Sequence, residues 1–224
     1  MSSVPDAAGP ALDALLRLLQ EGRAPIASST VPWARDVHIA DSLSALDLEP
    51  VRSAKLIADL GSGAGLPGLA LAAALPDARV DLIESVARKC AFLREAIERM
   101  GLANAQVICE RSEDWGGGRG REAYDVVTAR AVGPLATLAE LASPLLRDGG
   151  VLAAWKGARS GEEEAALRAA ARTGVEPLEI RTVQPYPASR DRHIHLLRKN
   201  GPTPNGLPRR PGMAAKRPFG SEPN

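Results

Sequence analysis

The stretch from residue 55 to residue 68 constrains the fold of this chain more than any other part of the sequence. It reads Lys-Leu-Ile-Ala-Asp-Leu-Gly-Ser-Gly-Ala-Gly-Leu-Pro-Gly, so an apolar run leads directly into Gly61, Gly63 and Gly65. Glycine adopts positive φ values at little cost and lets a ligand approach the main chain, while proline suits the first turn of a helix. The stretch therefore predicts a strand, a tight turn and a helix that together bind a nucleotide-like group.

Strand patterns and helical patterns alternate from residue 51 to residue 199. The predicted strands are 55–60, 79–84, 106–110, 124–129, 151–156, 178–184 and 193–198. The predicted helices between them are 65–74, 86–100, 134–146 and 161–172. Such alternation is typical of an α/β fold in which helices cover both faces of a parallel sheet. Only the turn-like segment 185–191 separates the last two strands, so we expect them to pair as an antiparallel hairpin at one edge.

The chain divides into three parts around this sheet. Residues 1–50 contain helical patterns at 11–20 and 37–46, and we expect them to form an N-terminal extension that packs on the core. Residues 51–199 form the α/β domain. Residues 200–224 are rich in proline and glycine and carry a local positive charge, so we expect a basic tail that is disordered in isolation.

Composition and charge fit an ordinary globular protein. Hydrophobic residues make up 45% of the chain and charged residues 25%, which excludes a wholly disordered, collagen-like or coiled-coil protein. The net charge of +1 gives no global positive field of the kind that indicates nucleic acid. The sequence shows neither a basic leader with an apolar run nor a long apolar segment, so we expect a cytoplasmic protein without a membrane partner.

The cysteines and histidines give no metal signature. Cys90 and Cys109 lack the close Cys or His neighbours of a zinc site, and we interpret them as reduced core residues. His193 and His195 share one face of the last predicted strand without nearby carboxylates or cysteines, so we do not interpret them as metal ligands. We therefore expect no metal.

Two cofactor classes fit the glycine motif. Residues 63–68 satisfy the dinucleotide pattern G-x-G-x-x-G, and Glu84 ends the next strand about 20 residues later, where an acid accepts hydrogen bonds from ribose hydroxyls. The carboxylate of Asp59, however, would lie close to the pyrophosphate of a dinucleotide and would repel it. The same carboxylate can face the cationic methionyl part of S-adenosylmethionine. The chain also lacks a Tyr-x-x-x-Lys pair and room for a separate substrate domain. These features favour S-adenosylmethionine, and the final antiparallel strand is typical of the Rossmann-like, seven-stranded class I methyltransferases.

Several motifs, in this order, resemble one family: residues 38–43 (His-Ile-Ala-Asp-Ser-Leu), 59–68, 111–114 (Arg-Ser-Glu-Asp), 128–131 (Thr-Ala-Arg-Ala), 156–157 (Lys-Gly) and 192–193 (Arg-His). The chain is similar over about residues 37–217 to the RsmG (GidB) family of small-subunit ribosomal RNA guanine-N7 methyltransferases. The resemblance implies methyl transfer to N7 of a guanine in 16S rRNA, in the 530 loop. The expected partner is 16S rRNA or the 30S particle, and we expect a monomer. Segment 25–33 departs from the family pattern.

The resemblance also assigns cofactor contacts within the predicted site. The contacts that it implies are Gly61, Leu66, Ser112, Glu113 and Arg130. The motif positions discussed above add Asp59, Gly63, Gly65 and Glu84 as expected cofactor contacts. Ser112 and Glu113 follow the third predicted strand, where they can flank the adenine. Arg130 follows the fourth strand, at the sheet edge where ligands of such folds bind.

The predicted chemistry needs no general base. N7 of guanine has an in-plane lone pair, so it can attack the sulfonium methyl directly, and rate enhancement comes from positioning the reactants. We expect Arg130 and Lys156 to shape the catalytic pocket. Arginines suit guanine edges and phosphates, and the expected RNA contacts are Arg111, Arg192, His193, Arg209 and Arg210.

Alternatives remain at this point. His38 and Asp41 can form a polar pair over the cofactor, or can only tie the N-terminal helix to the domain. The substrate could be a small molecule instead of RNA. The chain could also be a non-catalytic RNA-binding or ribosome-assembly module that retains the cofactor pocket, and an NAD-dependent oxidoreductase is the last alternative.

Overall fold

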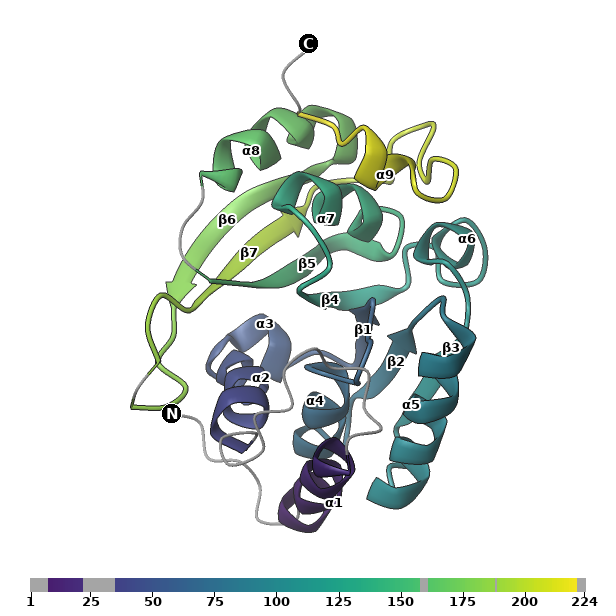
Figure 1. Ribbon diagram of the computed structural model, residues 1–224. Coiled ribbons are helices and arrows are strands. Elements are labelled where there is room, and N and C mark those ends of the chain that lie inside the picture. The colour runs from purple at the N-terminus through teal and green to yellow at the C-terminus, as the bar shows by residue number, and fades with distance from the viewer. Residues whose placement is uncertain (1–7, 22–34, 158–160, 188, 221–224) are drawn as a thin grey trace.

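The computed structural model describes residues 8–21, 35–157, 161–187 and 189–220. Within these residues the strands form one sheet in the order β3-β2-β1-β4-β5-β7-β6. The strands are β1 (Leu56–Leu60), β2 (Arg79–Ile83), β3 (Ala105–Ile108), β4 (Tyr124–Arg130), β5 (Leu146–Lys156), β6 (Val175–Thr182) and β7 (His193–Lys199). The first five strands are parallel, and β7 is antiparallel to both β5 and β6. The predicted seven-stranded α/β sheet is confirmed (Figure 1).

Helices cover both faces of this sheet, as predicted (Figure 1). One face carries α1 (Gly9–Gln20), α3 (Glu49–Arg52), α4 (Gly68–Ala74) and α5 (Ala87–Met100), whose apolar residues pack on Ile57, Val80 and Leu82. The opposite face carries α7 (Leu135–Ala142) and part of α8 (Glu162–Thr173), which pack on Ala58, Val127 and Leu152. Side chains alternate between the two faces along each strand, so nearly continuous apolar strands supply two core layers.

Two predicted helices differ in detail from the observed ones. The helix expected over 134–146 ends at Ala142 because Pro144 cannot continue it, and β5 begins at Leu146. The helix expected over 37–46 is a series of short turns: a π-helical segment Arg35–Ala40, then α2 (Asp41–Leu43), then a 3-10 segment Ser44–Asp47. The Ser42 and Ser44 hydroxyls each donate to a backbone carbonyl of the preceding turn, at 2.6 Å, which disfavours a regular helix.

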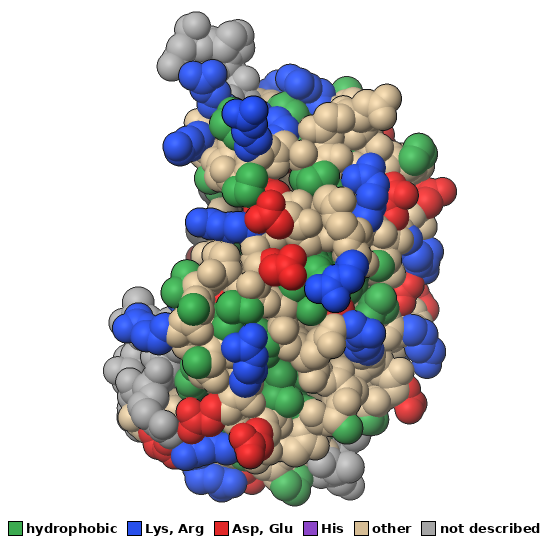
Figure 2. All heavy atoms as spheres, turned by 90° about the vertical axis from the view of Figure 1, so that its right-hand side faces the viewer, with side chains coloured by type: hydrophobic (Ala, Val, Ile, Leu, Met, Phe, Trp, Pro, Cys, Tyr) green, Lys and Arg blue, Asp and Glu red, His purple; other side chains and the backbone are tan. Residues whose placement is uncertain are grey.

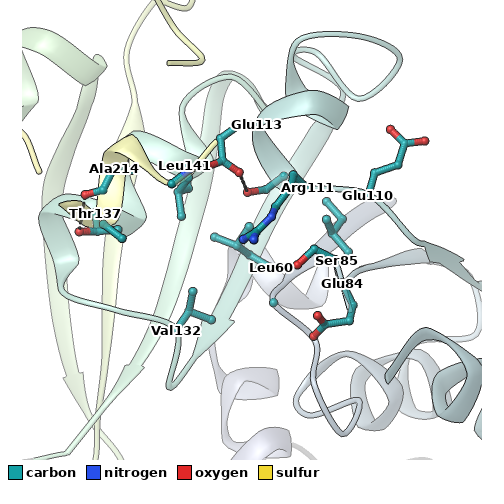
Figure 3. A pocket seen from close by; sticks show the side chains of 15 residues that line it. Leu60, Glu84, Ser85, Glu110, Arg111, Glu113, Val132, Thr137, Leu141 and Ala214 are labelled. Atoms are coloured by element: carbon teal, nitrogen blue, oxygen red, sulfur yellow. Dashed lines mark hydrogen bonds between the residues drawn. The ribbon is translucent and has the colours of Figure 1, made fainter. Parts of the chain in front are cut away.

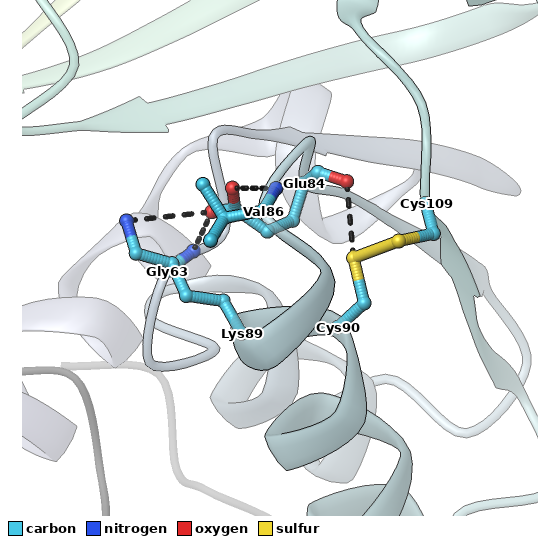
Figure 4. Close-up of a disulfide and its surroundings, with 6 residues drawn as sticks. All are labelled: Gly63, Glu84, Val86, Lys89, Cys90 and Cys109. Atoms are coloured by element: carbon cyan, nitrogen blue, oxygen red, sulfur yellow. Dashed lines mark hydrogen bonds and ion pairs between the residues drawn. A yellow bond between two sulfur atoms is a disulfide. The ribbon is translucent and has the colours of Figure 1, made fainter.

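The cysteines correct one prediction. Cys90, in α5, and Cys109, after β3, form a disulfide with a Cα–Cα distance of 5.9 Å, although the sequence predicts reduced thiols (Figure 4). Nineteen positions separate the two residues in sequence, but β2 and β3 are parallel neighbours, which brings the start of α5 and the end of β3 to the same sheet edge. Short-range spacing contains no signal of this contact.

The C-terminal segment corrects a second prediction. Residues 200–224 were expected to be disordered, yet residues 200–220 lie against the domain and include α9 (Met213–Lys216). Leu207 and Phe219 are buried in a small apolar cluster with residues of α7 and α8. The proline- and glycine-rich composition indicates only that the segment cannot form a core of its own. The segment instead packs its apolar residues on the surfaces of α7 and α8.

Two further observations concern the described residues only. None of the helices in these ranges has the length and hydropathy needed to cross a membrane. The same ranges contain no group of three or more His, Cys, Asp or Glu side chains arranged to hold a metal ion.

Candidate active site

A pocket opens at the carboxyl ends of β1, β2 and β3, at the edge of the sheet where ligands of doubly wound folds bind (Figure 3). Its lining comes from five places in the sequence: the end of β1, the end of β2, the segment after β3, the segment from Val132 to Leu141, and the C-terminal tail. The lining residues are Leu60, Gly61, Ile83, Glu84, Ser85, Glu110, Arg111, Ser112, Glu113, Val132, Thr137, Leu141, Gly212, Ala214 and Ala215.

The glycine loop forms the floor of this pocket. The backbone amides of Gly61 and Ser62 both donate to the carbonyl of Ile83, at 2.9 and 3.1 Å, which turns the chain sharply after β1. Gly61 has φ +65°, and a Cβ at this position would lie 2.9 Å from Cγ2 of Val132. The turn therefore requires glycine both for its backbone conformation and for the close approach of Val132. The predicted strand, turn and helix are confirmed.

Glu84 is held in place at the end of β2. Its side chain is nearly buried, and its carboxylate accepts hydrogen bonds from the amides of Gly63, at 3.1 Å, and Val86, at 2.9 Å, with the Lys89 ammonium 3.8 Å away (Figure 4). Each carboxylate oxygen has two lone pairs, so these contacts leave acceptor capacity toward the pocket. Glu84 therefore fits the predicted contact with ribose hydroxyls.

Asp59, a predicted cofactor contact, lies beneath the glycine loop. It is absent from the pocket lining, and Thr128 Oγ1 donates to its carboxylate at 2.7 Å inside the core. Side chains alternate along β1, so Leu60 lines the pocket while Asp59 points toward α4, where a Cβ on Gly68 would be 2.8 Å from it. Burial raises the pKa of Asp59 to about 6, against the opposing effect of hydrogen bonds from Thr128 and Ser62. Asp59 supports the loop from beneath.

Gly63, Gly65 and Leu66 of the glycine loop lie beneath the surface of the pocket. Leu66 is buried in the core beside α4, and Gly63 and Gly65 have φ values of +55° and +86°. None of the three appears in the pocket lining. Their contribution within the described residues is to shape the turn that presents Gly61.

The segment after β3 supplies the opposite side of the pocket. Ser112 and Glu113, which are predicted cofactor contacts, begin α6 (Ser112–Gly116), and both line the pocket. The Ser112 hydroxyl donates to Glu113 Oε2 at 3.0 Å, and the backbone amide of Gly212 donates to Glu113 Oε1 at 2.8 Å. Arg111, expected to contact RNA, points into the same pocket (Figure 3).

Arg130 lies at the end of β4 and outside the pocket lining. Its Nη1 donates to Oδ2 of Asp41 at 3.1 Å and lies within 3.4 Å of the His38 carbonyl oxygen. The Trp155 indole donates to the Asp41 carbonyl at 2.8 Å. The structure therefore pairs Asp41 with Arg130 and joins the α2 region to two strand ends. Ala131, which follows, has φ +58°, an uncommon conformation for a residue with a side chain.

Lys156 lies at the end of β5, next to the strand that carries Arg130. Its ammonium donates to the Gly133 carbonyl and to Glu162, both at 2.7 Å, and the same Glu162 oxygen accepts the Leu135 amide at 2.8 Å. Lys156 thus fixes the segment between β4 and α7. Nearby, the His193 ring is hydrogen-bonded to the Gly157 carbonyl at 3.0 Å.

The tail arginines have different surroundings. Arg209 forms a double hydrogen bond to Glu140, 2.5 Å for each pair of atoms, whereas Arg210 is exposed.

Sequence reasoning missed the tail residues of the pocket together with Val132, Thr137 and Leu141. Only Val132 could have been found, because it directly follows the Thr-Ala-Arg-Ala motif.

The pocket fits S-adenosylmethionine. The absence of a side chain at Gly61 keeps the pocket open beside Val132, which a Cβ would contact. Glu84 lines the same pocket and presents carboxylate oxygens that can accept hydrogen bonds from ribose hydroxyls. The family model described as rRNA small subunit methyltransferase G matches residues 26–194. The chain belongs to this family. The predicted resemblance is confirmed, and the protein is an S-adenosylmethionine-dependent methyltransferase.

Individual relatives agree with this assignment. The chain is 44% identical over 193 residues to ribosomal RNA small subunit methyltransferase G of Rubrobacter xylanophilus, covering 81% of this chain and 72% of that protein. It is 39% identical over 213 residues to the protein of the same name from Deinococcus radiodurans, covering 92% and 83%.

Solved structures show the class I methyltransferase fold. Fibrillarin of Aeropyrum pernix, in complex with natively bound S-adenosyl-L-methionine, superposes with a TM-score of 0.54 at 21% identity, covering 70% of this chain and 72% of that one. Cofactor-bound Rv0187 from MTB superposes with a TM-score of 0.57 at 21% identity, covering 90% and 100%. These likenesses concern the fold alone.

Proposed function

We propose that this methyltransferase transfers the methyl group of S-adenosylmethionine to N7 of a guanine in small-subunit ribosomal RNA, in the 530 loop of 16S rRNA. The observation that carries the proposal is the family match over residues 26–194, which spans both the glycine loop and the segment after β3 that line the pocket. The proposed partner is 16S rRNA or the 30S particle, and we propose that the protein acts as a monomer in the cytoplasm.

The proposed nucleophile needs no deprotonation. Glu84, Glu110 and Glu113 line the pocket, and the carboxylates of Glu84 and Glu113 accept hydrogen bonds from backbone amides. Guanine N7 carries its lone pair in the plane of the ring, so the new N–C bond can form as the bond from carbon to sulfur breaks, without a general base. The protein then contributes by holding the reactants in line and excluding water.

Arg130 and Lys156 support this proposal as positioning residues. Arg130 fastens the α2 region to the end of β4, and Lys156 fastens the segment that begins at Gly133. Val132, 37% exposed, lies between these two fixed points and lines the pocket. The two cations therefore shape the side of the pocket that we assign to the target base.

Replacing Arg130 by Ala tests this role. We expect loss of methyl transfer with the fold retained, because Asp41 and the α2 region lose their link to β4. Activity is compared with circular dichroism and cofactor binding, and Arg130→Lys should restore part of the turnover. Turnover that Arg130→Ala retains would remove Arg130 from the list of required residues.

The proposed RNA contacts lie in two places, at the start of β7 and on the C-terminal tail. Figure 2 shows Lys and Arg side chains on the upper part of the molecule, the part that contains α8 and α9. Arg192, His193 and Arg210 remain the proposed RNA contacts, together with Lys216 and Arg217, which are exposed on the tail. Arg209 is removed from this set because its guanidinium is bound to Glu140, and Arg111 is reassigned to the pocket.

The proposed RNA contacts are tested by salt dependence. The triple variant Arg210→Ala, Lys216→Ala, Arg217→Ala should bind RNA more weakly and with a smaller slope of log K against log salt, since each lost phosphate contact lowers the slope by about 1. Arg52→Ala is the control, because this exposed arginine of α3 lies outside the tail. An unchanged slope in the triple variant would contradict the assignment.

The reaction itself is tested with methyl-labelled S-adenosylmethionine and 30S particles from cells that lack the modification. Label at one guanine, mapped by cleavage at N7-methylguanosine, is the expected result. Cofactor binding without RNA labelling would favour the non-catalytic module. Turnover of a small molecule without RNA would favour the other alternative.

A further inference from the structure

The C-terminal tail lies on the cofactor pocket, although the family match ends at residue 194. Gly212, Ala214 and Ala215 line the pocket together with Ser112 and Glu113 of α6 (Figure 3). We propose that residues 209–219 form a wall of the S-adenosylmethionine pocket at its adenine end and contribute directly to cofactor affinity. We call this segment the tail wall.

Two hydrogen bonds attach the tail wall to residues that themselves line the pocket. The backbone amide of Gly212 donates to Glu113 Oε1 at 2.8 Å, and the Thr137 hydroxyl donates to the Ala214 carbonyl at 3.2 Å. Both partners lie on the domain, one in α6 and the other in α7. The tail wall therefore bridges the two helices that flank the pocket on this side.

A buried ion pair fixes the start of the tail wall. Glu140 of α7 is 3% exposed, and both of its carboxylate oxygens accept hydrogen bonds from Arg209. Arg209 Nη2 also donates to the Arg217 carbonyl at 2.7 Å, which closes the segment on itself. A carboxylate buried to this degree needs its cation, so the position of the segment is specific.

An aromatic contact fixes the other end. Phe219 is buried, and the guanidinium groups of Arg172 and Arg209 each lie 4.0 Å from the centre of its ring. Arg172 belongs to α8. Cation–π contacts of this kind add to the burial of the ring, so α8 and Arg209 hold the end of the segment together.

The types of residue that the tail wall places in the pocket lining are those expected beside a bound ligand. The three tail residues that line the pocket are the two smallest types, Gly and Ala, while the larger Arg210, Lys216 and Arg217 are exposed outside the lining. Small side chains keep the space beside Ser112 and Glu113 open. A flat aromatic base such as adenine is the part of the cofactor that fits between close walls of this kind.

A truncated chain that ends at Leu207 tests the proposal. This truncation keeps Thr203 and Leu207, which pack on the domain, and removes the tail wall. Calorimetric titration with S-adenosylhomocysteine, the demethylated product, should show affinity about tenfold weaker than the full chain, as expected when one wall of a pocket is lost. Equal affinity of the two chains would overturn the proposal.

A point variant covers the case in which the truncated chain does not fold. Ala215→Leu places a larger side chain at an exposed position of the lining, and Asn205→Leu adds the same side chain to the tail outside the lining. We expect Ala215→Leu to weaken S-adenosylhomocysteine binding at least fivefold and Asn205→Leu to change it less than twofold. Equal effects of the two variants would contradict the proposal.

Hydrogen exchange gives an independent readout in the unmodified protein. Binding of S-adenosylhomocysteine should slow exchange of the amides at 212–215, because the ligand covers this segment, and should leave those at 198–200 unchanged. No change at 212–215 would count against the proposal. These measurements need no RNA, so a failure of the RNA assignment does not affect them.

Discussion

The pocket has two walls that the chain builds in different ways. The loop wall, residues 59–68 with Glu84, is held by its backbone: its glycines have positive φ, and the amides of Gly61 and Gly63 donate to Ile83 and Glu84 at the end of β2. The tail wall consists of residues that reach the pocket through side-chain contacts with α6, α7 and α8, the pair Arg209 and Glu140 being the main one. Backbone conformation therefore determines the loop wall, whereas long-range pairing determines the tail wall.

This difference predicts how each wall fails. The loop wall should lose cofactor affinity when a single acceptor is removed, because Glu84 lines the pocket and also accepts the amide of Gly63. The tail wall should lose stability first and affinity as a consequence. The following variants compare the two, from the largest expected effect to the smallest.

Glu84→Ala should have the largest effect. We expect cofactor affinity to fall about 1,000-fold, or about 4 kcal/mol, because two hydrogen bonds to a charged group are lost, each worth about 1.5–3 kcal/mol. Glu110→Ala is the matched control, since Glu110 also lines the pocket but is 43% exposed. Calorimetry with S-adenosylhomocysteine measures both. Similar losses in the two variants would show that Glu84 has no special role.

Asp59→Asn should remove a pH dependence from the loop wall. The pKa of Asp59 is raised in the folded protein to about 6, so its neutral form favours folding: this contribution is full below about pH 4 and is lost as the pH rises to about 6. The loss amounts to about 3 kcal/mol. The asparagine variant keeps an acceptor for Thr128 and cannot ionise. Denaturant unfolding of both proteins across this pH range measures the difference, and parallel curves would contradict the prediction.

The base of the tail has the opposite pH dependence. Hydrogen bonds from Thr203 and Lys199 lower the pKa of Glu122 to about 2, so its contribution to stability is present above about pH 4.5 and is lost as the pH falls toward 2. Glu122→Gln should therefore destabilise the protein at pH 7 more than at pH 3. The same unfolding experiment compares the loop wall with the base of the tail, and an effect of equal size at pH 7 and pH 3 would contradict this prediction.

Arg209→Ala should destabilise the protein by about 2 kcal/mol, because it leaves the buried Glu140 carboxylate without its cation. Arg210→Ala, at the neighbouring exposed position, should change the free energy of unfolding by less than about 0.5 kcal/mol. Cofactor affinity should fall in Arg209→Ala only. Loss of stability with unchanged affinity would mean that the tail packs beside the pocket without serving it.

Gly61→Ala should have the smallest effect, about 1–2 kcal/mol of stability. Gly101 is the matched control, because it has the same φ of +65° but no atom within 4 Å of an added Cβ. The difference between the two alanine variants measures the contact with Val132. Adding Val132→Ala to Gly61→Ala should therefore reduce its cost to that of Gly101→Ala.

Much of the fold was predictable because its signals are local. Each predicted strand overlaps an observed one, since buried parallel strands are continuous apolar runs that end at Gly, Pro or polar residues. The glycine loop was predictable for the same reason, as its conformation depends on its own residues.

The site was predictable only in part, because contacts between distant segments have no local signal. Asp59 was assigned to the cofactor, but the alternation of side chains in β1 turns it toward α4. Cys90 and Cys109 meet only because β3 lies beside β2. The composition of the tail suggested disorder because the partners of Arg209 and Phe219 lie on helices far away in sequence.

Lys199 determines how the C-terminal segment can move. Its ammonium is fully buried and donates to Glu122, Thr203 and the carbonyls of Ser143 and Leu146 at distances of 2.6–3.1 Å. The segment is therefore anchored where it leaves β7, 10 positions before Arg209 begins the tail wall. Because the entropy of closing a loop rises only slowly with its length, docking the tail wall from this fixed point costs little more than closing a shorter connection.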